Sequence, residues 1–150
     1  MAFFATRINE FEKIYGAQGE KRISVGDNGE CVDLVKKEVA PLQNVSAHDS
    51  WKRGKRVKGN PHIVRGTAIA LFDDNGDYVS LHGKAHAAIY WSQDEKGITV
   101  YHQYRWKKER LRRPVHRAKL IFGDTNPEMN GDNYYIVELK KDPFPDDFSR

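Results

Sequence analysis

Apolar residues recur at helical spacing in the N-terminal part of the chain. Between residues 7 and 15 they stand three or four positions apart, at Ile8, Phe11, Ile14 and Tyr15. The same spacing returns from about residue 29 to 39, where Val32, Val35 and Val39 would share one face. Residues three and four apart lie together on a helix, so we expect one helix in each segment.

Beyond residue 60 the pattern changes to short apolar and aromatic runs separated by turn-forming sequences, which is typical of β-strands. Residues 42–60 are polar and are expected to form a loop or a short helix. N-terminal helices followed by an antiparallel meander predict an α+β fold. The expected strands are 63–72, 85–92, 97–106, 116–122 and 133–139.

The length of 150 residues predicts a single domain, 1–150, built around one core. No apolar run approaches the roughly 20 residues that cross a bilayer, so no membrane insertion is expected. The N-terminal sequence MAFFATRINEFEK does not have the pattern of a secretory signal peptide. The acidic, proline-containing end, from about residue 140 to 150, predicts an irregular tail.

Positive charge is concentrated in two stretches, although the net charge is only +4. The first stretch spans residues 52–58 and the second spans residues 105–113, which ends a mix of aromatic and basic residues that begins at residue 101. Such stretches suit nucleic acid or another polyanion, but more often they are simply solvated. A non-enzymatic polyanion-binding protein is therefore the alternative to an enzyme, and nucleic acid is not the partner that we expect.

Cys31 is the only cysteine, so the fold cannot depend on an intramolecular disulfide. It follows an Asn-Gly turn, and Asp27 with Glu30 resembles a capping box that starts the helix just before Cys31. A helix N-terminus lowers the pKa of a thiol, and the thiolate is the nucleophilic form. The backbone N–H of Cys31 would also lie where an oxyanion develops. This setting favours nucleophilic catalysis.

A nucleophilic cysteine needs a base, and His86 stands in the strand-like run at residues 85–91. The imidazole would need a third group to orient it. His102 and Gln103 are the polar candidates on the following strand, and they would point to opposite faces. The register of the two strands decides between them.

These segments resemble the CHAP and NlpC-type cysteine peptidases and amidases, papain-like enzymes that cut amide bonds in bacterial peptidoglycan. The resemblance rests on NGECVDLV (28–35) and AHAAIYWSQDEKGITVYHQY (85–104), and it extends over a core of about residues 26–122. It implies a papain-like domain with Cys31 as nucleophile and His86 as general base and acid. By spacing it favours Gln103 as the orienting residue, with His102 in reserve.

Trp51, Gly54 and Val57, together with GTAIA at 66–70, resemble a family of small, stand-alone bacterial amidases that includes type VI secretion effectors. Trp51 would either line the substrate cleft or belong to the core, and of these two we favour the cleft. No cofactor is implied. A metal site is not expected, because the four-residue spacing of His82 and His86 suits ligands on a helix but is followed here by a strand, and no cysteine or carboxylate stands at ligand spacing.

The resemblance also implies partners and a place of action. The substrate would be peptidoglycan, and the enzyme would be made in the cytoplasm and carried by a secretion apparatus into the periplasm of a target bacterium. An effector of this kind implies a periplasmic immunity protein that blocks the cleft. A phage-type endolysin is the alternative within the same chemistry, and the bond that is cut stays open.

Overall fold

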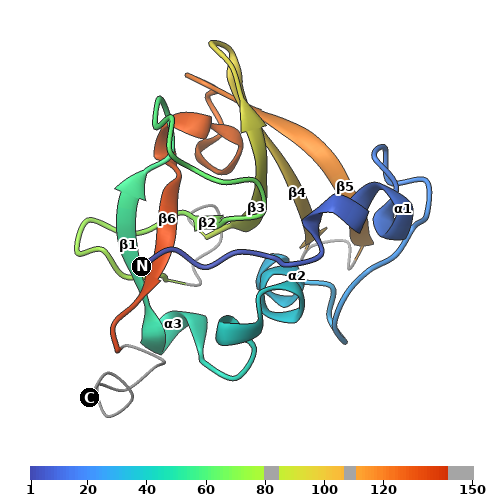
Figure 1. Cartoon of the computed structure of the whole chain (residues 1–150), viewed down its shortest axis with the longest axis horizontal. Coiled ribbons are helices and arrows are strands. Elements are labelled where there is room, and N and C mark those ends of the chain that lie inside the picture. Colours follow the sequence, from blue (N-terminus) through green and yellow to red (C-terminus); the bar gives the residue numbers. More distant parts are fainter. Residues whose placement is uncertain (80–84, 107–110, 142–150) are drawn as a thin grey trace.

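The computed structural model describes residues 1–79, 85–106 and 111–141, without the side chains of residues 106 and 111. Six strands form one antiparallel sheet in the order β1-β6-β2-β3-β4-β5. Figure 1 shows the sheet bending between its β1–β6 side and its β4–β5 side. The strands are β1 (Trp51–Arg56), β2 (Ala68–Ala70), β3 (Ala87–Gln93), β4 (Gly97–Trp106), β5 (Leu111–Ile121) and β6 (Tyr135–Leu139).

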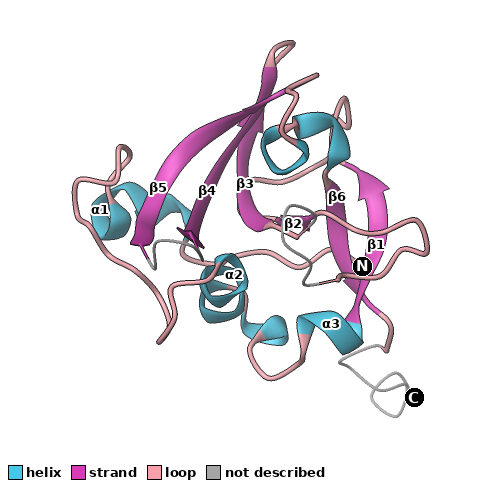
Figure 2. Cartoon of the chain, turned by 180° about the vertical axis from the view of Figure 1, so that it is seen from behind, coloured by secondary structure: helices cyan, strands magenta, loops and turns pink. Residues whose placement is uncertain are grey.

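Three short α-helices accompany the sheet in the described residues. They are α1 (Phe11–Tyr15), α2 (Cys31–Glu38) and α3 (Ala47–Ser50). Helix α2 packs against β3 and β4, and the view from behind in Figure 2 shows it at the open side of the bent sheet. Helices packed on an antiparallel sheet confirm the predicted α+β fold.

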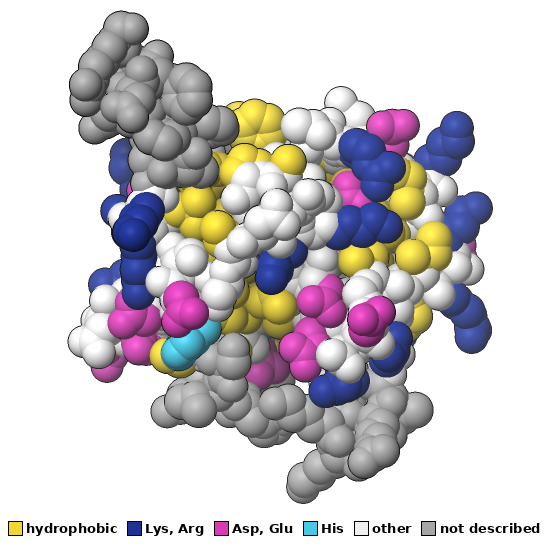
Figure 3. Space-filling model, turned by 90° about the horizontal axis from the view of Figure 1, so that it is seen from below, with side chains coloured by type: hydrophobic (Ala, Val, Ile, Leu, Met, Phe, Trp, Pro, Cys, Tyr) yellow, Lys and Arg dark blue, Asp and Glu magenta, His cyan; other side chains and the backbone are white. Residues whose placement is uncertain are grey.

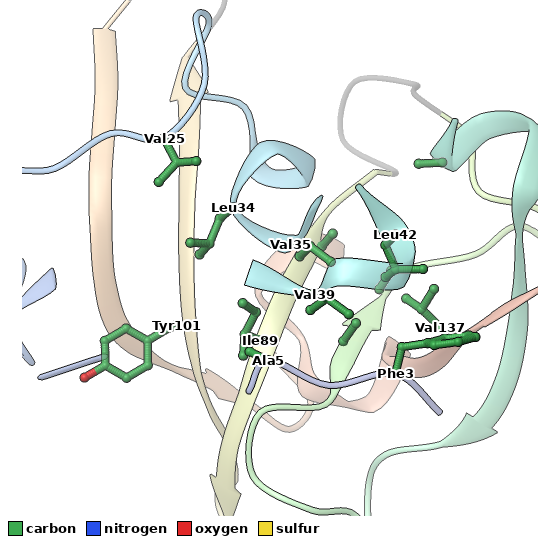
Figure 4. Close-up of a cluster of buried hydrophobic side chains, with 14 of the residues drawn as sticks. Phe3, Ala5, Val25, Leu34, Val35, Val39, Leu42, Ile89, Tyr101 and Val137 are labelled. Carbon is green, nitrogen blue, oxygen red and sulfur yellow. The ribbon is translucent and has the colours of Figure 1, made fainter. Parts of the chain in front are cut away.

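The core holds α2 rigidly on the sheet. Leu34 and Val35 of α2 are completely buried and lie in one cluster with Ile89 of β3 and Tyr101 of β4 (Figure 4). Side chains alternate along β3, so Ala88 belongs to a second cluster on the other face of the sheet. Burial of one such aliphatic side chain contributes about 1.5–3 kcal/mol to the stability of the fold. This packing holds the start of α2 in place on the sheet.

Helix α2 begins at Cys31, as predicted, but its capping residues differ from the predicted pair. Glu30, not Asp27, occupies the N-cap, and its N–H donates to Asp33 Oδ2 over 3.3 Å. The reason is the backbone of Gly26 and Gly29, whose φ angles of 81° and 64° lie in the left-handed region. The chain therefore turns twice before it becomes helical, and the first helical residue is Cys31.

The expected loop at 42–60 is partly wrong, because it contains α3 and β1. Strand β1 lies at the edge of the sheet, where most of its side chains are exposed, so it lacks the apolar alternation of a half-buried strand. The strand expected over 63–72 is shortened to Ala68–Ala70, whereas β5 starts at Leu111 instead of 116.

The core also exceeds the expected range of 26–122. Phe3 and Phe11 from the N-terminal segment and Val137 from β6 are buried in the cluster beneath α2. Residues 142–150, which make up most of the predicted acidic tail, lie outside the described residues. Within the described ranges, no helix combines the length and apolar character of a membrane-spanning segment.

Candidate active site

The thiol of Cys31 projects from the first residue of α2 and is half-buried. Its Sγ lies 3.7 Å from the hydroxyl oxygen of Tyr78. It also interacts with the backbone of Ala87, the first residue of β3. The helix start thus places the only cysteine directly against the strand that follows His86.

The ionisation of this thiol differs from the expectation. Burial raises the pKa of Cys31, although the Tyr78 hydroxyl and the Ala87 backbone act in the opposite direction. Burial likewise raises the pKa of Tyr78 well above its ordinary value, so Tyr78 stays protonated. The predicted lowering of the Cys31 pKa is therefore wrong for the free protein, in which the thiol is neutral and lies within hydrogen-bond distance of the Tyr78 hydroxyl.

His86 immediately precedes β3 and is buried, and its Nε2 lies 2.8 Å from Nδ1 of His102. The pairing of Ile89 with Tyr101 puts His102 on the same face of the sheet as His86. The preference for Gln103 as the partner of His86 is therefore wrong, and His102 occupies that position. The reason is strand register, which spacing along the sequence does not determine.

Burial, together with the nearby His116, lowers the pKa of His86 to about 4. The imidazole is therefore neutral at pH 7. Its Nε2 is engaged with His102, so Nδ1 is the nitrogen that remains for proton exchange with a substrate or with the thiol. Among the described residues, the hydrogen-bond partner of the Cys31 thiol is the Tyr78 hydroxyl and not His86. The site thus holds a neutral thiol and a neutral imidazole base on adjoining elements.

Gln103 performs a different task from the predicted one. It is completely buried, and its Oε1 accepts from the Val25 N–H over 2.8 Å. Its Nε2 donates to the carbonyl oxygens of Val25 and Glu30, over 2.8 and 2.7 Å. The Glu30 carbonyl belongs to the peptide group that carries the Cys31 N–H, so Gln103 sets the orientation of that N–H.

Trp51 does not line a cleft. Its side chain is 0% exposed, and its ring lies 5.0 Å from the ring of Tyr78. The expected contact between Trp51 and substrate is wrong because the side chain points into the core beneath Tyr78. Trp51 instead supports Tyr78, the residue that contacts the Cys31 thiol.

Two residues of the site were missed by sequence reasoning. Tyr78 ends the turn sequence at 73–78 and has no local sign of a role, and His116 reaches His102 only because β5 pairs with β4. The Nε2 atoms of His102 and His116 are 3.2 Å apart. Among the described residues, no group of three histidine, cysteine or carboxylate side chains is arranged to hold a metal ion.

Comparison with known proteins identifies the family. The chain matches the family described as "Domesticated amidase effector 2" over residues 3–137. A relative named "Domesticated amidase effector 2", from Ixodes scapularis, is 41% identical over 125 residues, 81% of this chain and 79% of that protein. The "Type VI secretion amidase effector 2 protein" of Salmonella typhi is 33% identical over 124 residues, 76% of this chain and 88% of that protein.

A solved structure has the same fold. It is described as "Type 6 secretion amidase effector 2 (Tae2)", with a TM-score of 0.71 and 25% identity over 93% of this chain and 96% of the other. The six-stranded sheet with α2 against it is thus the fold of an amidase effector. The chain therefore belongs to the domesticated amidase effector 2 family, a family of amidases.

Proposed function

We propose that this protein is a cysteine amidase that hydrolyses amide bonds of bacterial peptidoglycan and acts as an antibacterial effector. Cys31 is the nucleophile and His86 the general base and acid. The observation that supports this most directly is the thiol at the start of α2, lying against the strand that follows a buried, oriented His86. The amidase effectors in the family supply the reaction class.

In the first half of the reaction the thiol leaves Tyr78 and gives its proton to Nδ1 of His86. The Cys31 sulfur then forms a bond to the carbonyl carbon of the substrate amide. As the C–N bond breaks, His86 returns the proton to the leaving nitrogen, and a thioester on Cys31 remains. A neutral imidazole is the form that can accept the first proton, in keeping with the lowered pKa of His86.

In the second half water attacks the thioester. His86 takes a proton from the water while oxygen bonds to the carbonyl carbon, and the C–S bond breaks. The proton returns to the sulfur, and the product leaves as a carboxylic acid, which releases its remaining acidic proton to water. In both halves the Cys31 N–H donates to the developing oxyanion, held in place through the contact between Gln103 and the Glu30 carbonyl.

The proposal also includes the enzyme superfamily and the place where the protein acts. The site is of the papain-like kind found in CHAP and NlpC-type enzymes, with His102 as the third residue. The protein would be delivered to the peptidoglycan of a target cell, and the name of the Salmonella typhi relative, a type VI secretion amidase effector, supports delivery by a secretion apparatus. An immunity protein that covers the Cys31 thiol is the expected partner.

Polyanion binding is the weaker alternative, because many basic side chains are already engaged. Lys58 pairs with Asp132, Arg105 pairs with Glu30, and Arg112 donates to the Asp27 carbonyl. On the face shown in Figure 3, basic side chains are spread out with acidic ones among them. The basic side chains in the described part of the two stretches therefore mainly make contacts within the protein and do not form a single patch for a polyanion.

The test is digestion of purified peptidoglycan sacculi by wild type, Cys31→Ala and Cys31→Ser, with fragments identified by mass spectrometry. Both variants are expected to lose hydrolysis by several orders of magnitude, because no other group supplies the nucleophile. The exposed His62→Ala is the matched control and should retain activity. Wild-type digestion by Cys31→Ala would overturn the proposal.

The same variants test the place of action in a Gram-negative host. With an added periplasmic signal peptide, wild type should lyse cells, and Cys31→Ala should be tolerated. Without the signal peptide both should be tolerated. Toxicity in the cytoplasm that persists in Cys31→Ala would instead favour a polyanion-binding protein.

A further inference from the structure

Three buried histidine rings form a row across neighbouring strands. His86 precedes β3, His102 lies on β4 and His116 lies on β5, and His102 pairs directly with His116 in the sheet register. The ring centroids are 4.9 Å apart in the first pair and 4.6 Å apart in the second. At the far end, His116 Nδ1 lies 2.8 Å from the carbonyl oxygen of Pro114.

The carbonyl of Pro114 determines which nitrogen donates in each hydrogen bond of this row. A carbonyl oxygen only accepts, so Nδ1 of His116 carries a proton and donates to it. A neutral imidazole carries one N–H, so Nε2 of His116 is an acceptor. Burial lowers the pKa of all three rings, which keeps them neutral at pH 7.

The rule that a neutral imidazole carries one N–H then assigns the proton on His102 and on His86. Because Nε2 of His116 accepts, Nε2 of His102, 3.2 Å away, must donate, and Nδ1 of His102 is left as an acceptor. Nε2 of His86, 2.8 Å from that atom, must donate in turn. Nδ1 of His86 is therefore unprotonated, which is the form that a general base requires.

We propose that His116, anchored by the Pro114 carbonyl, is a positioning residue that fixes the Nδ1-unprotonated tautomer of His86 through His102. The role as a base rests on the proposed function, whereas the tautomer itself does not. If His116 donated instead, every bond in the row would reverse, and the proton of His86 would lie on Nδ1.

The packing around His116 supports a fixed ring. Gly19 has a φ of 77°, and a Cβ built there would lie 2.9 Å from Cβ of His116, so the chain passes directly over this residue. The ring of Tyr104 lies against His102 and His116, at 5.5 and 6.2 Å between centroids.

The experiment measures the tautomers by long-range ¹H–¹⁵N correlation of imidazole-labelled protein at pH 7.5. In wild type, His86 and His102 should carry the proton on Nε2, and His116 should carry it on Nδ1. A proton on Nδ1 of His86 in wild type would overturn the proposal without any variant. Because this NMR measurement does not depend on enzymatic activity, its result is valid whether or not the amidase proposal is correct.

Two variants separate hydrogen bonding from packing. His116→Gln keeps an acceptor for His102 and should keep the His86 tautomer and kcat within about threefold of wild type. His116→Met keeps the size but offers only a weak acceptor, so kcat should fall about ten- to a hundredfold with KM nearly unchanged. The exposed His62→Met is the control and should change neither quantity.

The outcomes distinguish the two proposals. If His116→Met left both the His86 tautomer and kcat unchanged while Cys31→Ala abolished hydrolysis, the role of His116 would be refuted and the amidase proposal would stand. If His116→Met does not fold, as judged by its melting curve, the wild-type tautomers and the His116→Gln variant still decide the question.

Discussion

At the scale of single residues, burial decides the chemical state of the site. A thiol at a helix N-terminus is expected to ionise easily, but enclosure of Cys31 outweighs that effect and raises its pKa. Burial also keeps His86 neutral. The resting pair is therefore a neutral thiol and a neutral imidazole.

Alkylation of Cys31 by iodoacetamide should show this neutral state. Because the pKa of Cys31 is raised, its rate should keep increasing with pH beyond the point where free cysteine reaches a plateau. The measurement is the second-order rate constant between pH 6 and pH 10, with glutathione as reference. A plateau already reached below pH 7 would show a thiolate–imidazolium pair instead.

Tyr78→Phe serves as the companion variant for that measurement. Removing the hydroxyl takes away a donor that stabilises the thiolate, so the pKa of Cys31 should rise further. Alkylation at a given pH should then be slower than in wild type. A faster reaction would mean that the hydroxyl mainly shields the thiol.

At the scale of elements, one side chain connects β4 to the turn before α2. Gln103 binds both backbone groups of Val25 and the Glu30 carbonyl, and it does so from inside the core. The segment between these residues contains two left-handed glycines and would otherwise have several possible paths. The amide of Gln103 selects the path that brings Cys31 to the first turn of α2.

Gln103→Leu should therefore affect both stability and rate. It leaves buried backbone groups unpaired, each at a cost of about 1–3 kcal/mol, so urea unfolding should shift to lower concentration. Misplacing the Cys31 N–H should reduce kcat on the order of ten- to a hundredfold in protein that is still folded. The control is Gln43→Leu, because the side chain of Gln43 is exposed and donates to the Lys37 carbonyl at the surface.

A purely structural role would predict a different result from the same pair of variants. In that case Gln103→Leu would lower the unfolding midpoint, and kcat per folded molecule would match that of Gln43→Leu. Such an outcome would remove Gln103 from the positioning of the oxyanion donor, and its stabilising role would remain.

At the scale of the whole molecule, the row of buried histidines makes stability depend on pH. The pKa values of His86, His102 and His116 are lowered in the folded state, while unfolded histidine titrates near 6.5. Below about pH 6.5 the unfolded chain therefore binds more protons than the folded one. The stabilising contribution is complete above that pH and is lost as pH falls toward the folded value, about 4 for His86.

The free energy of unfolding should thus decrease between pH 7 and pH 5, before most carboxylates titrate. Each buried histidine contributes up to about 1.4 kcal/mol per pH unit in that window. Urea unfolding at several pH values measures the slope, which should be smaller in His116→Gln and unchanged in the exposed His62→Gln. A flat profile over this range would contradict the burial of neutral histidines.

Part of the fold and of the site was predictable because its signals are local. The apolar spacing at 29–39 gave α2, the Asn-Gly turn placed Cys31 at the helix start, and the strand-like run after residue 85 gave His86 its place beside β3. Helical spacing and turn chemistry depend on neighbours within a few positions, which a single sequence contains. The α+β fold and the amidase family followed from these segments.

The rest depended on which strands meet and in which register. A shift of one residue between β3 and β4 exchanges His102 for Gln103, and spacing along the chain favoured the wrong one. His116 joins the row only because β5 pairs with β4. Tyr78 contacts the thiol across 47 positions of sequence. The sequence by itself thus determined the place of Cys31 at the start of α2, whereas tertiary structure decided the surroundings of the thiol, because contacts between distant segments arise only when the sheet has assembled.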